Sequence, residues 1–136
     1  MLHWPTPFNW RSGETWKAFD EFRAEGRVRT LGVCNFLPEH LERLHKETGE
    51  YPAVNQIELH PTWQQREVVA YCKAHKGIGV EAYSPMARGA DLNAGDGVIE
   101  RIARAHGVTE AQVILRWHIE NGTIIIPKSV HADRQR

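Results

Sequence analysis

Apolar and polar residues follow two different periods along this chain. In residues 13–25 the apolar residues Trp16, Phe19 and Phe22 recur at helical spacing, and Gly26 follows as a stop signal. This spacing predicts an amphipathic helix. The same kind of pattern predicts further helices over residues 38–48, 64–76, 97–106 and 109–121.

Short apolar runs separate the helical segments and predict strands. Met1 and Leu2 look like the end of a strand, and further runs cover residues 27–33, 53–59, 77–85 and 123–127. An alternation of strands and helices is typical of β/α units with parallel strands. Segments that are apolar on both faces suit a sheet covered by helices or closed into a barrel. No linker or domain boundary interrupts the pattern.

The last predicted helix has a recognisable start. Thr109 is followed three residues later by Gln112, a capping-box pattern in which both side chains satisfy backbone N–H groups of the first turn. Gly122 ends this helix.

Composition narrows the possible classes of protein. The 136 residues contain 17 Lys and Arg and 17 Asp and Glu, so no basic surface points to nucleic acid. The apolar runs, such as Ile124–Ile126, are all far too short to span a membrane. Two unpatterned cysteines without a signal peptide favour a reducing cytoplasm over a disulfide scaffold. We therefore expect a cytoplasmic globular protein.

Polar residues stand where the predicted strands end. They are His3, Asn35, Gln56, Tyr83 with Ser84, and Lys128 with Ser129. In parallel α/β folds, and in barrels especially, ligands bind at the carboxyl ends of the strands. Isolated polar groups inside a sheet cost free energy unless they are hydrogen-bonded. We therefore expect these residues to converge at one rim and to form a site.

The motifs together resemble the aldo-keto reductase family. They are LHWPTP, ETWKAFDEFRAEGRVRTLGVCNF, PAVNQIELHP, VEAYSPMARG, TEAQVILRWHIENGTIIIPKSV and Arg134, in the order and spacing of that family. The resemblance implies an α/β fold of the (β/α)8 TIM barrel type. Residues 1–136 are similar to the second half of such a barrel, from the end of the fourth strand to just past the eighth. They are interpreted as one partial domain, truncated at both ends.

The resemblance also implies an activity, the NADPH-dependent reduction of an aldehyde or ketone to an alcohol. His3 matches the family's active-site histidine, which orients and polarises the substrate carbonyl. Without the resemblance, a strand-end histidine satisfied by the backbone is the favoured interpretation. Trp4 matches an aromatic wall of the substrate pocket, with simple core packing as the alternative.

Several residues match the family's nicotinamide site. Asn35 and Gln56 match residues that hydrogen-bond the carboxamide, because both side chains carry donors and acceptors. Cys34 stands where the family usually has serine, and a small buried apolar residue is its alternative role. Tyr83 matches the ring that stacks on the nicotinamide, and Ser84 begins a loop expected to meet the pyrophosphate.

A second group matches the site for the adenosine 2′-phosphate. Lys128, Ser129 and Arg134 supply two cations and a hydroxyl for a dianion, and the backbone amide of Val130 joins them. This group implies NADPH rather than NADH. The alternative is a solvated basic loop.

Three of the family's four catalytic residues, an Asp, a Tyr and a Lys, are not matched in this sequence. We expect this chain alone to be inactive and to self-associate through open barrel edges. Two alternatives stay open, a non-catalytic NADP(H)-binding or assembly module and an unfolded product of a truncated reading frame. No metal site is expected. His60 is interpreted as structural, and His75, His106, His118 and His131 as surface or helix-end residues.

Overall fold

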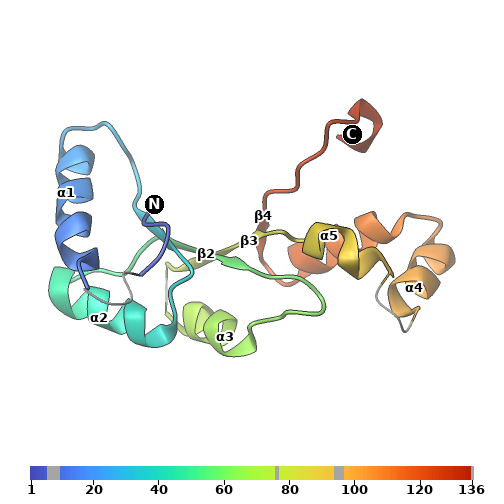
Figure 1. Ribbon diagram of the computed structural model, residues 1–136, viewed down its shortest axis with the longest axis horizontal. Coiled ribbons are helices and arrows are strands. Elements are labelled where there is room, and N and C mark those ends of the chain that lie inside the picture. Colours follow the sequence, from blue (N-terminus) through green and yellow to red (C-terminus); the bar gives the residue numbers. More distant parts are fainter. Residues whose placement is uncertain (6–9, 76, 94–96, 136) are drawn as a thin grey trace. The chain divides into compact units, whose positions relative to one another are not determined.

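The computed structural model describes residues 1–5, 10–75, 77–93 and 97–135. Thr6 and Pro7 of the first family motif, and Lys76 at the end of the third predicted helix, lie outside the described residues. The chain forms two compact units, which are described separately (Figure 1). The first comprises Met1–Ile57 and Gln65–Glu81, and the second comprises Glu58–Gln64 and Ala82–Arg136.

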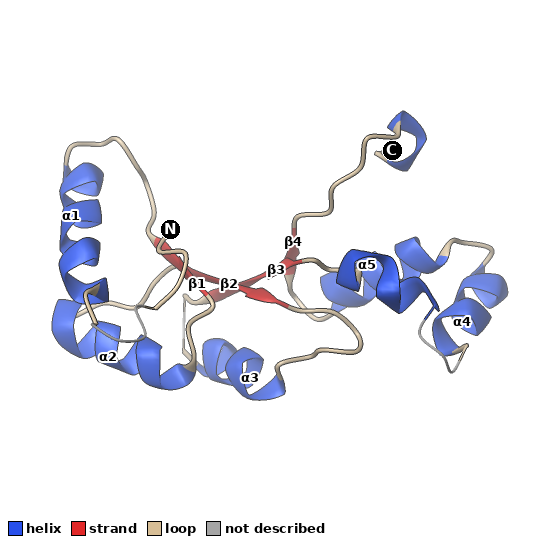
Figure 2. Cartoon of the chain, in the orientation of Figure 1, coloured by secondary structure: helices blue, strands red, loops and turns tan. Residues whose placement is uncertain are grey.

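The predicted alternation of strands and helices is confirmed. The elements are α1 (Ser12–Ala24), β1 (Gly32–Cys34), α2 (Pro38–Thr48), β2 (Val54–Glu58), α3 (Arg66–Ala74), β3 (Gly79–Tyr83), α4 (Val98–His106), α5 (Glu110–Glu120) and β4 (Ile124–Ile125). Two short 3-10 segments, η1 (Ala87–Asn93) and η2 (Ala132–Arg134), were not expected from the sequence. Hydrogen bonding orders the strands β1-β2-β3-β4 (Figure 2).

The strands of the first unit pair in parallel, as the β/α order predicted. Cys34 is the register partner of Gln56 in the β1–β2 pair, and Leu2 forms a parallel bridge to Val33 on the other side of β1. Parallel pairing brings the carboxyl ends of neighbouring strands to the same edge. The residues that follow Leu2, β1 and β2 therefore lie close together.

Helices cover the apolar side of this unit. Trp16 of α1 and Leu41 and Leu44 of α2 are almost completely buried, and the two helices are in contact. The indole N–H of Trp16 donates to Glu50 at 2.6 Å, which satisfies the one polar atom that this ring buries.

The first predicted strand is shorter than expected. Residues 27–30 form bends and irregular backbone after a turn at residues 25–26, rather than strand, because Gly26 adopts a left-handed φ of 73° and Arg27 N–H donates to the carbonyl of Phe22 at 2.9 Å. The Arg27 guanidinium then covers the Phe22 ring at 4.4 Å. Val28, which the pattern placed in the strand, is 39% exposed for this reason.

The second unit is built on α4, α5 and β4. Its last helix begins as predicted, since Gln112 N–H donates to the Thr109 hydroxyl at 3.3 Å and Thr109 N–H donates to the Gln112 side chain at 2.9 Å. Ala103 of α4 and Ile114 of α5 are buried between elements in contact.

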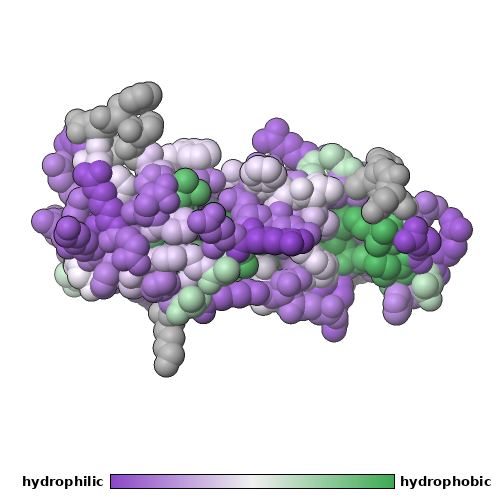
Figure 3. Space-filling model, turned by 90° about the horizontal axis from the view of Figure 1, so that it is seen from below, coloured by the Kyte–Doolittle hydropathy of each residue, from purple (hydrophilic) through white to green (hydrophobic). Residues whose placement is uncertain are grey.

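Part of this unit exposes apolar side chains to solvent. Figure 3 shows an apolar area over the α4–α5 part of the chain. The exposed large apolar residues of that segment are Val98, Ile102, Val108 and Ile119. No helix in the described ranges is both long enough and apolar enough to cross a membrane.

Candidate functional site

His3 is held at the carboxyl end of β1 through its backbone. Cys34 N–H donates to the Leu2 carbonyl at 2.6 Å, and the Asn35 side-chain amide donates to the His3 carbonyl at 3.1 Å. The His3 and Trp4 rings are exposed and lie 6.1 Å apart in an edge-on arrangement. Because the backbone is tied on both sides of His3, its imidazole faces outward from a defined position.

Asn35 itself sits in a strained turn that a neighbouring asparagine stabilises. Its φ is 60°, a left-handed conformation that Asn tolerates better than most residues. The next residue, Phe36, is clamped by the buried Asn55, which donates to its carbonyl at 2.8 Å and accepts from its N–H at 3.3 Å. Asn55 was not singled out in the sequence, since it reads there as one more strand residue.

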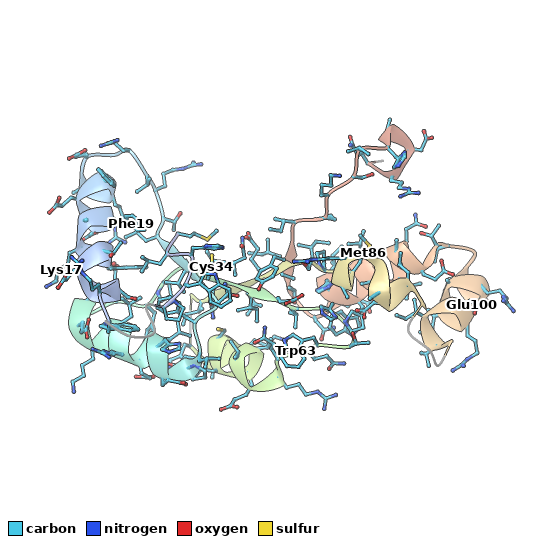
Figure 4. The ribbon with its side chains drawn as sticks, viewed as in Figure 1. Lys17, Phe19, Cys34, Trp63, Met86 and Glu100 are labelled. Atoms are coloured by element: carbon cyan, nitrogen blue, oxygen red, sulfur yellow. The ribbon has the colours of Figure 1, made fainter. Side chains whose placement is uncertain are left out.

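Cys34, Gln56 and Glu81 form a row across β1, β2 and β3. The Gln56 amide donates from Nε2 to a carboxylate oxygen of Glu81, and its Oε1 lies 3.8 Å from the Cys34 Sγ. Figure 4 labels Cys34 among the side chains drawn as sticks. The row fixes the orientation of the Gln56 amide, with the donor toward Glu81 and the acceptor toward Cys34.

Cys34 has the burial that one of its two expected roles implies, and its place in a nicotinamide site stays a prediction. It is 4% exposed, as expected of a small buried residue, and burial raises the pKa of its thiol. Its Sγ nevertheless faces the Gln56 amide rather than an apolar neighbour. A neutral thiol can serve here as a weak donor to the amide oxygen.

Tyr83 and Ser84 belong to the second unit. Ser84 has a φ of 48°, and the segment after it contains three further left-handed residues, Ala87, Arg88 and Gly89. The sequence predicted that all these polar residues lie together at one rim. Within the first unit, the structure brings together His3, Cys34, Asn35 and Gln56. That the residues of the second unit join them stays a prediction.

The basic residues near the C-terminal end lie on a short ordered turn of the second unit. The Ser129 hydroxyl accepts from His131 N–H at 3.1 Å, and the Gln135 side chain donates to the Ser129 carbonyl at 2.8 Å. Three neighbouring residues are exposed: Lys128, Val130 and Arg134, the last residue of η2. The charged groups of Lys128 and Arg134 are therefore available to an anion in solution.

His118 was expected at the surface or a helix end. It lies in the last turn of α5, so the helix-end placement holds, but its side chain is completely buried and the surface placement is wrong. It follows Ile114 by four residues, so both occupy the inward face of the helix. Its Nε2 lies 3.0 Å from the Pro85 carbonyl, and burial lowers the pKa of its imidazole.

A second buried polar group lies near the end of β2. His60 Nδ1 is 3.0 Å from an oxygen of Asp91, whose carboxylate is almost completely buried, and the Thr62 hydroxyl donates to the other oxygen. The structural role expected for His60 is consistent with this contact. Asp91 carried no signal in the sequence, because its partners precede it by about 30 residues.

Two of the three tyrosines are engaged away from the strand ends. Tyr51 donates to Glu42 at 3.0 Å, and Tyr71 donates to the same carboxylate oxygen. Burial, with the Glu42 carboxylate second, raises the pKa of Tyr71, while the two phenols lower the pKa of Glu42. A phenol with a raised pKa is a poor general acid at neutral pH.

Metal ligation is not supported within the described ranges. No group of three or more His, Cys, Asp or Glu side chains is arranged there to hold an ion.

Comparison with known proteins identifies the family of this chain. The model of the family described as "Aldo/keto reductase family" matches residues 1–135. The chain belongs to the aldo/keto reductase family. An aldo-keto reductase of Mycolicibacterium smegmatis is 52% identical over 98% of this chain, and the methylglyoxal reductase DkgA of Escherichia coli K12 is 44% identical over the same share.

Solved structures of aldo-keto reductases give the same result for the fold. The structure of a Gox0644 mutant in complex with NADPH superposes with a TM-score of 0.90 at 48% identity, over 97% of this chain and 48% of that one. An aldo/keto reductase from Brucella melitensis gives a TM-score of 0.85 at 46% identity, over 97% of this chain and 49% of that one. The expected membership of the family and its partial (β/α)8 barrel are thereby confirmed.

The match covers only part of each relative. The chain spans about half the length of the curated relatives it matches, 48% for both the M. smegmatis and the E. coli protein.

Proposed function

We propose that this chain provides the cofactor-binding portion of an NADPH-dependent aldo-keto reductase, together with its carbonyl-orienting histidine. The observation that carries the proposal is the ordered row that joins Cys34 at the end of β1 to Gln56, which lies in the middle of β2 rather than at the strand end expected from the sequence. Next to it the Asn35 side chain donates to the backbone of His3. Support comes also from the Gox0644 mutant, a relative whose structure contains NADPH.

The residues present fit the nicotinamide end of the cofactor. A carboxamide needs one acceptor for its N–H groups and one donor for its oxygen, and the Asn35 and Gln56 side chains offer both. With Nε2 committed to Glu81, Gln56 presents Oε1 as the acceptor. Tyr83 is proposed to stack on the ring and Ser84 to meet the pyrophosphate.

The residues also fit the phosphate end. Lys128 and Arg134 are exposed cations on a turn ordered by Ser129, and the guanidinium group binds phosphate oxygens in pairs. The Val130 backbone is proposed to contribute its N–H group. We therefore propose a preference for NADPH over NADH.

When bound, NADPH supplies the hydride for reduction of an aldehyde or ketone. The chain's own part in the reaction is orientation. The exposed His3 imidazole is proposed to donate a hydrogen bond to the substrate carbonyl oxygen, and the Trp4 ring to line the substrate pocket. No proton donor is assigned to Tyr51 or Tyr71, because both hydroxyls are bound to Glu42.

Turnover therefore requires catalytic groups from outside these 136 residues. The test is to mix the purified chain with the remaining half of the E. coli methylglyoxal reductase. NADPH oxidation is then followed with methylglyoxal as the probe substrate. We expect oxidation on mixing, none with either half alone, and a loss of at least about tenfold in kcat for His3→Leu.

A second candidate function is NADP(H) binding without catalysis. It is favoured because the Tyr51 and Tyr71 hydroxyls are both bound to Glu42. The same experiment separates the two functions. Tight NADPH binding by a mixture that forms but never oxidises the cofactor would establish the non-catalytic module and contradict the reductase.

A further inference from the structure

The segment that follows Tyr83 has an unfavourable backbone conformation. The φ values are 48° for Ser84, 49° for Ala87 and 55° for Arg88, in the left-handed region that residues other than glycine adopt rarely. Gly89 follows with a φ of 98°. Non-glycine residues keep such a conformation only where the surrounding structure imposes it. Internal hydrogen bonds, from Ala87 N–H to Ser84 and from Gly89 N–H to Met86, close the turns but do not attach the segment to anything else.

One end of this segment is attached to α5 by a buried histidine. The Nε2 of His118 lies 3.0 Å from the Pro85 carbonyl oxygen, which can only accept, so Nε2 carries the hydrogen and donates. His118 is completely buried, and its Nδ1 has no hydrogen-bond partner among the described residues. An apolar residue would fill this place without that cost, so packing alone does not explain a histidine here.

The other end is attached by a second histidine. His60 Nδ1 donates to Asp91 at 3.0 Å, and Thr62 donates to the second oxygen of the same carboxylate. Asp91 is 1% exposed, so these donors satisfy oxygens that water does not reach. His60 and Thr62 lie just after β2, at the antiparallel bridge that joins His60 to Trp63.

We infer that His60 and His118 are positioning residues that hold the segment Ser84–Asn93 in a preformed shape for the cofactor. The two histidines come from different elements and form hydrogen bonds with Pro85 and Asp91. These two residues bracket the left-handed residues 87–89, and Ser84 immediately precedes Pro85. The inference rests on the proposed function, in which this segment meets the pyrophosphate. A preformed loop loses less conformational entropy when the cofactor binds. The two histidines therefore increase the affinity for the cofactor without contacting it themselves.

Trypsin cleavage tests the attachment without any cofactor. Arg88 is exposed in the middle of the segment and Arg29 is exposed in the irregular backbone after α1. In the unaltered chain we expect cleavage after Arg88 to be at least about tenfold slower than after Arg29, because a protease needs an opened backbone. Equal rates would overturn the inference with no variant required.

Variants then assign the effect to the two contacts. Asp91→Leu and His118→Phe remove the hydrogen bonds, and Asp91→Asn keeps an acceptor for His60. The exposed His106→Gln is the matched control. We expect about tenfold faster cleavage after Arg88 for the first two, rescue by Asp91→Asn, and no change for the control. Unchanged cleavage in folded Asp91→Leu and His118→Phe chains would overturn the inference.

NADPH titration of the same variants separates this inference from the proposed function. For a chain that binds NADPH, we expect the dissociation constant to rise about tenfold in the variants whose segment is released. Faster cleavage with unchanged affinity would contradict the positioning role. Failure of the unaltered chain to bind NADPH would count against the proposed function, and with it against a cofactor role for the segment.

Discussion

The side-chain amide of Gln56 donates a hydrogen bond to the carboxylate of Glu81, from β2 to β3. Neither the spacing nor the polarity of the sequence indicated this pair, whose members are 25 residues apart. The contact settles which end of the Gln56 amide faces Cys34 and which end remains as an acceptor. Glu81 thus controls the orientation of a proposed cofactor ligand.

Replacement of Glu81 tests this control. In Glu81→Leu the Gln56 amide loses its acceptor, and we expect NADPH affinity to fall about threefold to tenfold, the equivalent of one net hydrogen bond of about 0.5–1.5 kcal/mol. Glu81→Gln keeps an acceptor oxygen and is expected to lose less. Fluorescence titration with NADPH measures both, with the exposed Glu21→Leu as the control. Equal affinities for Glu81→Leu and the unaltered chain would rule out an orienting role.

Asn55 is expected to be more important for stability than any other polar residue of β2. It forms two hydrogen bonds with the Phe36 backbone in the interior. Asn55→Leu leaves a buried N–H and a buried carbonyl unpaired, so the free energy of unfolding should fall by about 2–4 kcal/mol. Asn55→Asp keeps only the acceptor and should give an intermediate loss. Urea denaturation measures these changes, and a loss below about 0.5 kcal/mol for Asn55→Leu would show that the clamp is dispensable.

Acid is expected to destabilise the chain through His118. Burial lowers the pKa of this imidazole from its ordinary value of 6.5, so below that pH the unfolded state binds more protons than the folded state. The free energy of unfolding should therefore be constant above about pH 7 and decrease as the pH falls through 6.5, by at most about 1.4 kcal/mol per pH unit.

The groups that face His118 make this dependence specific to it. His60 opposes the protonated form and Asp91 favours it, while Pro85 offers only a carbonyl. His118→Gln retains an N–H donor for Pro85 and does not titrate. Urea denaturation at a series of pH values should show a smaller slope for this variant, and an identical slope would place the effect elsewhere.

Both cysteines are expected to react slowly with thiol reagents. Cys34 and Cys72 are free and buried, and burial raises the pKa of each thiol. Because the thiolate is the reacting form, labelling at pH 8 should be at least about tenfold slower than for free cysteine and should recover that rate in urea. Cys34→Ser assigns the two rates. Labelling of Cys34 at the rate of free cysteine would contradict its place in the Gln56 row.

The secondary structure could be predicted from the sequence because its signals are local. The Thr109 capping box and the stop at Gly49, which takes a left-handed φ of 82°, depend only on neighbouring residues. The irregular backbone at residues 27–30 was missed because the apolar Val28 imitates a strand residue, whereas the reversal at Gly26 decides the conformation.

The site could be predicted only in part, because its contacts depend on the register between strands. His3, Asn35 and Gln56 were found because they are polar residues assigned to strand ends, although Gln56 lies in the middle of β2. Asn55, which holds the Phe36 backbone, and Glu81, which holds Gln56, look like ordinary strand residues until the contacts between strands and loops are known. His118 was misjudged since a lone polar residue near the end of a helix usually faces solvent, and only the buried Ile114 four residues earlier pointed inward.

The measurement that tests the central claim most directly is a thermal melt of this chain with and without NADPH, followed by tryptophan fluorescence. At about a hundredfold excess over the dissociation constant, NADPH should stabilise the folded state by about 2.7 kcal/mol. For a chain of this size that is an increase in Tm of roughly 5–15 °C, and NADH should give less. A melt that does not respond to NADPH, or that shows no cooperative transition, would contradict a cofactor-binding function for these residues.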